Sequence, residues 1–195
     1  TLLLTSLDEI AWVTNIRGDD IEYNPVCFSY MVITKYDSLL FANTKSFDEK
    51  TIYRLSEEGV KIKEYDEIYD YVKVIPEYTT LWLDKTTTNY SILRSIKPEV
   101  KIIDKFSPAL HLKAIKNNVE IENMINAHIM DGVAVTRFIY WLKHNVSKEK
   151  MTEISIANKL EEFRKSWKTY LAPSFETIVI NFTSEPSFPA ELDRV

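Results

Sequence analysis

His128 and Asp131 are the pair of residues in this sequence whose types and spacing most suggest metal chemistry. They lie in NAHIMDGVAVTRFIYWL, residues 126–142, a segment whose apolar periodicity predicts a helix. Side chains three positions apart share one face of a helix, so an imidazole and a carboxylate could reach the same cation. A metal site needs three or four converging ligands, however. The remaining histidines, His111 and His144, share no motif with this pair.

A structural explanation of His128 competes with the metal site. At helical spacing His128 falls on an apolar stripe, where a histidine is usually a core residue with one hydrogen-bonded ring nitrogen. Gly132 on the same stripe lowers helix propensity by roughly 1 kcal/mol, which favours a role in close helix packing. We therefore predict that His128 and Asp131 are structural. The stripe consists of Ile121, Ile125, His128, Gly132, Val135, Ile139 and Leu142.

Composition excludes several classes of protein. A net charge of −5 argues against a general nucleic-acid binder. The sequence contains no run of about 18 apolar residues, so no membrane span is predicted. The single cysteine, Cys27, cannot form an internal disulfide, which favours a reducing compartment such as the cytoplasm. With only three glycines, neither a dinucleotide-binding fingerprint nor a P-loop can be written.

The first hundred-odd residues alternate short β-rich runs with helical patterns, which predicts an α/β fold with a mixed sheet flanked by helices. Ser6 and Glu9 have the spacing of a capping box, and Gly18 is a candidate left-handed C-cap. The apolar run Val26–Thr34 predicts a central strand with Cys27 buried. Strands are predicted at 1–5, 26–34, 38–42, 60–65, 79–84 and 99–104, and helices at 6–15, 47–59, 66–75, 88–96 and 107–115.

The pattern changes near Lys113. Two longer helices are predicted at 119–144 and 152–170, the second with Thr152 as its N-cap, and SFETIVINF, residues 174–182, has the character of a strand. We expect a domain boundary at about residues 112–117. The sequence lacks an initial methionine and begins within an apolar run, so we expect it to be part of a longer protein.

Three segments in series resemble the three-domain, cytosolic-type Xaa-Pro aminopeptidases. TSLDEIAWVTNIRGDDIEYNPVCFSY is similar to the start of their middle domain, which is creatinase/prolidase N-terminal-like. LKAIKNNVEIENMINAHIMDGVAVTRFIYWL resembles the linker and first long helix of their "pita-bread" metallopeptidase domain. MTEISIANKLEEFRKSWKTYLAPSFETI resembles the next helix and strand. The resemblance implies a middle domain at 1–112, the start of a truncated pita-bread domain at 113–178, and a divergent tail at 179–195.

The resemblance also implies an activity and its cofactors. Family members remove an N-terminal residue that precedes proline, with two metal ions, usually manganese, that activate a bridging water. The family's metal ligands lie downstream of the segment matched here, so we expect no metal site in this chain and no activity of the chain alone. The implied partners are proline-containing peptides and a second subunit in a homodimer, with no nucleic acid and no membrane.

The resemblance places the loop NIRGDDIEYNP near the catalytic cleft of the full-length family, where Arg17 or Asn24 could shape the substrate entrance. A salt bridge from Arg17 to Asp19 or Asp20 is the structural alternative. Two further functional readings stay open, a non-catalytic peptidase-like binding module and a creatinase or prolidase relative.

Overall fold

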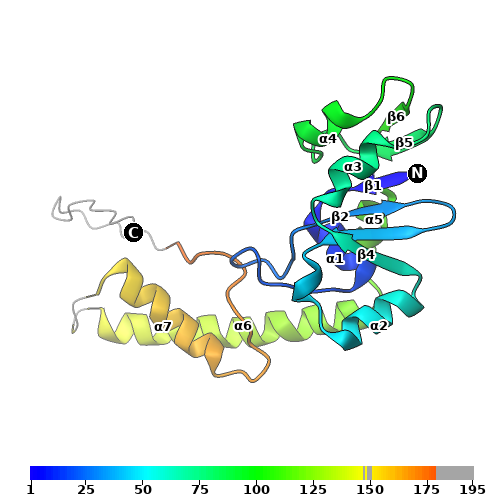
Figure 1. Cartoon of the computed structure of the whole chain (residues 1–195). Coiled ribbons are helices and arrows are strands. Elements are labelled where there is room, and N and C mark those ends of the chain that lie inside the picture. The colour runs from blue at the N-terminus through cyan, green and yellow to red at the C-terminus, as the bar shows by residue number, and fades with distance from the viewer. Residues whose placement is uncertain (147, 149–150, 179–195) are drawn as a thin grey trace, which may run out of the picture. The chain divides into compact units, whose positions relative to one another are not determined.

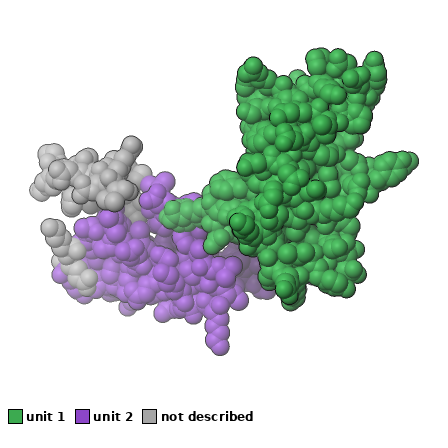
Figure 2. Space-filling model, in the orientation of Figure 1, with its two compact units in different colours: residues 1–117 green, residues 118–195 purple. Residues whose placement is uncertain are grey.

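The computed structural model describes residues 1–146, 148 and 151–178. The chain divides into two compact units, the first spanning Thr1–Asn117 and the second beginning at Asn118. Figure 1 labels the elements, and Figure 2 shows the two units in separate colours. Among the described residues, no helix combines the length and hydropathy needed to cross a lipid bilayer.

The first unit alternates strands with short helices, as the sequence predicts. Its strands are β1 Leu2–Leu4, β2 Ser29–Ile33, β3 Ser38–Ala42, β4 Val60–Glu64, β5 Thr80–Leu83 and β6 Lys101–Asp104. Its helices are α1 Leu7–Thr14, the 3-10 turn η1 Thr44–Ser46, α2 Glu49–Glu57, α3 Glu67–Lys73, α4 Tyr90–Ser95 and α5 Pro108–Ala114.

The six strands form one mixed sheet in the order β4-β3-β2-β1-β5-β6. β2 pairs antiparallel with both β1 and β3, while the β3–β4, β1–β5 and β5–β6 pairs are parallel. The turn at KYD joins β2 and β3, where the Thr34 hydroxyl accepts the amide of Asp37 at 2.8 Å. The prediction of a mixed sheet flanked by helices is therefore confirmed.

Alternating residues of the strands enter two separate cores, one on each face of the sheet, because successive side chains of a strand point to opposite faces. Leu3, Val32 and Phe41 pack with α3 and α4 on one face. Their neighbours Leu4 and Met31 pack with α1, α2 and α5 on the other. Figure 1 shows α3 on the opposite side of the sheet from α1 and α5. Near-continuous apolar strands are expected of a sheet that is covered on both faces.

The central position of the strand predicted at Val26–Thr34 is confirmed, since β2 lies between β3 and β1. Its first residue is Ser29 rather than Val26, because the preceding residues belong to a loop. Cys27 in that loop is only partly buried, so the prediction of a buried thiol is wrong.

Helix ends follow the predictions at some positions and not at others. The helix predicted at 47–59 ends at Glu57, and Gly59, two residues later, has a φ of 78°. Thr152 accepts the amide of Ser155 as the N-cap of its helix, so that prediction is confirmed. Ser6 is an N-cap without a side-chain hydrogen bond, so the predicted capping box with Glu9 is wrong. The left-handed C-cap of α1 is Asn15, with a φ of 48°, and not Gly18.

The second unit contains α6 Asn118–Asn145 and α7 Glu153–Lys165. The second helix ends earlier than the predicted residue 170. Residues 174–178, the described part of the strand predicted at SFETIVINF, form no strand. The predicted tail at 179–195 lies outside the described residues.

The helices α6 and α7 pack through aromatic rings and cations. Lys159 of α7 lies 5.5 Å from the ring centroids of both Trp141 and Phe163, and Arg137 lies 5.1 Å from the ring of Phe163. Ammonium and guanidinium groups at such distances are attracted to the faces of aromatic rings. Ala134 is the fully buried residue of this contact. The face of α6 that packs against α7 is therefore the one that carries Ala134, Arg137 and Trp141.

The apolar stripe predicted on α6 is not the packed face. Ile121, Ile125 and Ile139 are among its exposed residues, and His128 and Gly132 are exposed as well. Because α6 carries apolar residues on more than one face, periodicity alone could not select the face that α7 covers. The prediction that His128 is a core residue is therefore wrong, although one of its ring nitrogens does have a hydrogen-bond partner.

Candidate substrate-entrance loop

The residues that first suggested metal chemistry are engaged separately. Nδ1 of His128 lies 2.8 Å from the carbonyl oxygen of Met124, one helical turn earlier. The carboxylate of Asp131 accepts hydrogen bonds from Arg164 of α7, from Nε at 2.6 Å and from Nη2 at 3.4 Å. This two-point ion pair ties α6 to α7. Among the described residues, no group of three or more His, Cys, Asp or Glu side chains is placed to hold a metal ion.

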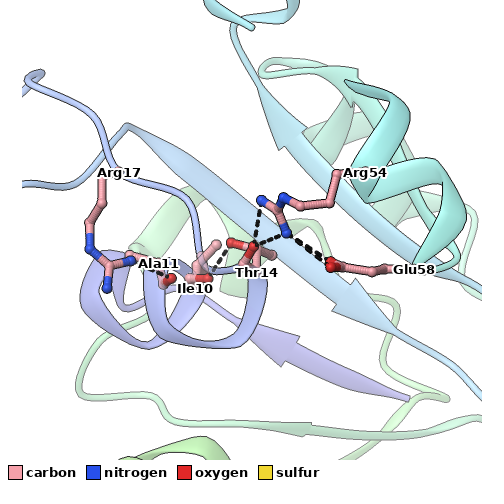
Figure 3. A network of polar contacts seen from close by, with 6 residues as sticks. All are labelled: Ile10, Ala11, Thr14, Arg17, Arg54 and Glu58. Atoms are coloured by element: carbon pink, nitrogen blue, oxygen red, sulfur yellow. Dashed lines mark hydrogen bonds and ion pairs between the residues drawn. The ribbon is translucent and has the colours of Figure 1, made fainter. Parts of the chain in front are cut away.

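The loop between α1 and β2, residues 15–28, contains the two residues predicted to line a substrate entrance. It starts at the C-terminus of α1, where the last carbonyl groups of a helix lack partners within the helix. Arg17 supplies one partner, since its Nη1 donates to the carbonyls of Ala11 at 3.0 Å and Ile16 at 2.8 Å. A cation at this end also interacts favourably with the helix dipole. Figure 3 shows the Arg17 guanidinium beside the carbonyl of Ala11.

A second arginine completes the end of α1. Arg54 of α2 donates from Nη1 and Nη2 to the carbonyl of Thr14, both at 3.1 Å, and pairs with Glu58 at 2.9 Å (Figure 3). The hydroxyl of Thr14 donates back to the carbonyl of Ile10 at 2.6 Å. The start of the loop is therefore held by side chains that lie 3 and 40 residues from the end of the helix.

The predicted alternative for Arg17, a salt bridge within the loop, is wrong. In the described part of the chain, Arg17 forms no ion pair with Asp19 or Asp20. The carboxylate of Asp20 instead accepts the amide of Phe28 at 2.7 Å and so closes the loop on itself. Arg17 is exposed, which leaves guanidinium donors beside the helix end that can face solvent.

Asn24 closes a tight turn in the same loop. Its backbone N–H donates to the carbonyl of Ile21 at 3.1 Å, and its side-chain Nδ2 donates to the carbonyl of Glu22 at 3.3 Å. Tyr23, between them, has a φ of 66°. Asn24 is exposed, and among the described residues no hydrogen bond joins it to Arg17. The structure places the two side chains on one loop but does not bring them into contact.

Gly18 fixes the path of the loop by close approach rather than by its backbone angles. A Cβ built on Gly18 would lie 2.8 Å from the Cβ of Cys27 and 3.0 Å from the carbonyl oxygen of Val26. Contacts of this length between a Cβ and backbone or Cβ atoms cannot be relieved by rotating a side chain. The loop thus passes directly over the entry to β2.

We expect Gly18→Ala to destabilise the first unit by about 1–3 kcal/mol, the usual cost of overpacking. Chemical denaturation of the chain would measure this as a lower midpoint at an unchanged slope. Gly132→Ala is the control, since a Cβ at Gly132 meets nothing within 4 Å and should stabilise α6 slightly. Equal midpoints for Gly18→Ala and the unmodified chain would contradict the steric explanation.

Cys27 has the environment of an unreactive thiol. Burial raises the pKa of this thiol above its ordinary value, and the charge of Asp20 acts in the same direction. A reactive cysteine needs the opposite shift, because the thiolate is the nucleophile.

One cleft was not predicted from the sequence. It has a volume of about 740 Å³ and lies at the carboxyl ends of the parallel strands β5 and β6, an edge where α/β sheets often bind ligands. The sequence signal for this cleft was an aspartate at the end of each strand, Asp84 directly after β5 and Asp104 as the last residue of β6. Both carboxylates are engaged locally, Asp84 with the amide of Thr86 and Asp104 with the amide of Lys85. The cleft is lined by Trp82, Asp84, Thr86, Asp104, Lys105, Phe106, Pro108, His111 and Leu112.

The architecture of the first unit is that of a known domain. Residues 1–120 match the creatinase/prolidase N-terminal domain. The chain belongs to this family. It is also 38% identical to an Xaa-Pro aminopeptidase of Drosophila melanogaster, over 91% of this chain and 29% of that protein. A probable Xaa-Pro aminopeptidase P of Coprinopsis cinerea is 37% identical, over 94% of this chain and 33% of that protein.

Among solved structures, the chain is similar to an X-prolyl aminopeptidase of Caenorhabditis elegans. The TM-score is 0.83 and the identity 31%, over 91% of this chain and 30% of that one. The C. elegans protein is described as a cytosolic enzyme with a di-nuclear active site. This creatinase/prolidase family member spans about a third of the length of the curated relatives it matches. Its described residues do not fit such a metal centre, because no group of ligands converges.

Proposed function

We propose that this chain is the segment of an Xaa-Pro aminopeptidase that comprises the middle domain and the entry to the metallopeptidase domain. The observation that supports the proposal is the similarity to the C. elegans X-prolyl aminopeptidase, at 31% identity across 91% of the chain. The whole enzyme removes an N-terminal residue that precedes proline. In the proposed division, residues 1–112 are the middle domain and residues 113–178 begin the pita-bread domain.

The proposal also covers the location, assembly, substrates and metal ions of the whole enzyme. It would act in the cytoplasm as a homodimer on proline-containing peptides, with two manganese ions held by residues outside the segment described here. The cytosolic location and di-nuclear site of the C. elegans relative support this assignment. The described residues of this chain contribute no metal ligand to it. Their part is to support and shape the route by which peptides enter.

Arg17 and Asn24 are the residues we assign to that route. Arg17 is held beside the end of α1 by two carbonyl groups, which restricts its guanidinium to one region while leaving it exposed. A restrained guanidinium can bind a peptide carbonyl or carboxylate at a lower entropic cost than a free one. Asn24 lies in a turn of the same loop and is also exposed.

We expect Arg17→Ala in the full-length enzyme to raise KM for peptides longer than three residues by about three- to tenfold, which is the loss of one solvent-exposed hydrogen bond worth about 0.7–1.4 kcal/mol. The value of kcat should stay the same, because the contact is equal in the bound and transition states. Steady-state kinetics on a dipeptide and on a pentapeptide that share the same Xaa-Pro start would measure both constants.

Arg94→Ala is the matched control, since Arg94 is an exposed arginine of α4 outside the loop. It should change neither constant. Denaturation of each variant separates a structural loss from a binding loss, because Arg17 also caps α1. Unchanged KM for both peptides would remove the assignment of Arg17. Absence of Xaa-Pro hydrolysis in the unmodified full-length protein, with manganese supplied, would remove the proposed function itself.

A further inference from the structure

The helix α5 is held to its unit by few apolar contacts. It is the last element before α6; its small Ala109 is 5% exposed, and its larger Leu110 is 37% exposed. Leu112 is 57% exposed, and Ile115, directly after the helix, is 76% exposed. An element with so little buried apolar area opens at a lower free energy than the core of a protein. Polar contacts therefore contribute to the attachment of α5 beside the packing of Ala109.

The main polar contact is a buried hydrogen bond between α5 and α1. The hydroxyl of Ser107 donates to Oε2 of Glu9, and the two residues are only 6% and 7% exposed. The same hydroxyl accepts the amide of Leu110 at 3.2 Å and so forms the N-cap of α5. Ser107 thus caps the N-terminus of α5 and also links α5 to Glu9 of α1. A buried carboxylate without this partner would carry a large desolvation cost.

A second contact joins the same two helices closer to the surface. Lys113, in the last turn of α5, forms an ion pair with Asp8 of α1. The side chains of Lys113 and Asp8 are 31% and 57% exposed, so this ion pair contributes less to the attachment of α5 than the buried hydrogen bond does. Adjacent acidic residues in the first turn of α1 therefore hold the two ends of α5.

We propose that α5 is a latched strap, held closed by the Glu9–Ser107 hydrogen bond and able to detach from α1 while the sheet stays folded. The chain before the strap is anchored independently, because the amide of Lys105 donates to the carbonyl of Leu83 at 3.1 Å, and Nε1 of Trp82 donates to the carbonyl of Lys105 at 3.0 Å. Release would therefore begin after Lys105 and end at α6.

The latch sets the length of the connection between the first unit and α6. With α5 docked, residues 115–117 connect it to α6, which begins at Asn118. With α5 released, the connection extends from residue 106 to residue 117. Each extended residue adds about 3.3–3.6 Å of reach. The strap would thus switch the connection from short to long without unfolding the sheet.

Hydrogen exchange of the full 195-residue chain tests the proposal. Ser107→Ala removes the cap and strands the carboxylate of Glu9, so exchange of the amides from Leu110 to Ala114 should rise on the order of 30-fold. Exchange in β5 and β6 should stay unchanged. Asp48→Ala is the matched control, because Asp48 caps α2 through the amide of Thr51 at 2.7 Å with no buried cross-link of this kind. It should raise exchange only at the start of α2.

Two further variants identify the latch itself. Ser107→Thr keeps a hydroxyl and should restore slow exchange in α5. Glu9→Ala combined with Ser107→Ala should expose α5 no more than Ser107→Ala alone, since both changes remove one contact. A rise confined to the amide of Leu110 would overturn the proposal, because it would indicate fraying of the cap. A rise spread equally over β5 and β6 would also overturn it, because it would indicate global unfolding.

Discussion

Purified by itself and supplied with manganese, the 195-residue chain should release no N-terminal residue from an Xaa-Pro peptide. A dinuclear site needs several carboxylates and a histidine that hold two ions roughly 3.5–4 Å apart. The described residues contain no group of three or more such ligands. His128 and Asp131, the best pair in the sequence, lie against Met124 and Arg164 instead. Without the ligands, no group can activate the water, so turnover should be absent rather than reduced.

Calorimetric titration with manganese and a proline-peptide assay on the same sample would measure the two expected results. The full-length protein in the same buffer is the control, since it should bind the metal and cleave. His128→Ala in the isolated chain is a second control and should change neither signal. Micromolar affinity for manganese together with release of an N-terminal residue would return His128 and Asp131 to the list of metal ligands.

The order of the elements in the first unit was predictable because the signals that determine it are local. Period-two alternation in VKIKE and the glycine after α2 gave β4 and the end of the helix before it. The two-sided burial of β2 was visible as a continuous apolar run. Such patterns depend on residues within a few positions of one another, and the structure confirms them.

The errors occurred where a residue's partner lies outside the regular spacing of its own helix or strand. Glu9 has the spacing of a capping-box residue for Ser6, but its carboxylate accepts the hydroxyl of Ser107, 98 residues later. Gly18 has the spacing of a C-cap, but its lack of a Cβ accommodates the close approach of Val26 and Cys27. The structural alternative for Arg17 was a salt bridge with Asp19 or Asp20, but its guanidinium donates to the backbone carbonyls of Ala11 and Ile16 instead. None of these contacts leaves a periodic signal in the sequence.

The candidate site also has features that the sequence predicts and features that it does not. A polar loop between α1 and β2 was predictable, and so was the presence of Arg17 and Asn24 on it. The anchoring of the loop by Arg54 was not, because α2 contributes this side chain from 40 residues away. The prediction for α6 failed for a related reason. Its apolar residues fit more than one stripe, and only the packing of α7 on Ala134 and its neighbours selects the buried face.

Phe41→Ala should cause the largest loss of stability, about 3–5 kcal/mol in the free energy of unfolding of the first unit. Phe41 is the last residue but one of β3, pairs with Tyr30 of β2 and Lys63 of β4, and is 1% exposed. Its ring packs edge-on against Tyr71 of α3, with centroids 5.6 Å apart. Truncation removes this contact and leaves a cavity between the sheet and α3 that neighbouring strands cannot close.

Phe28→Ala is the matched control, because it deletes the same atoms from a side chain that is 50% exposed. Its cost should stay under about 1 kcal/mol. Domains are stable by only about 5–15 kcal/mol, so Phe41→Ala could leave too little folded protein to measure. Phe41→Leu keeps most of the volume and should cost under about 2 kcal/mol, which keeps the series measurable. Urea denaturation that ranks Phe28→Ala as equal to Phe41→Ala would contradict the assignment of Phe41 to the core between the sheet and α3.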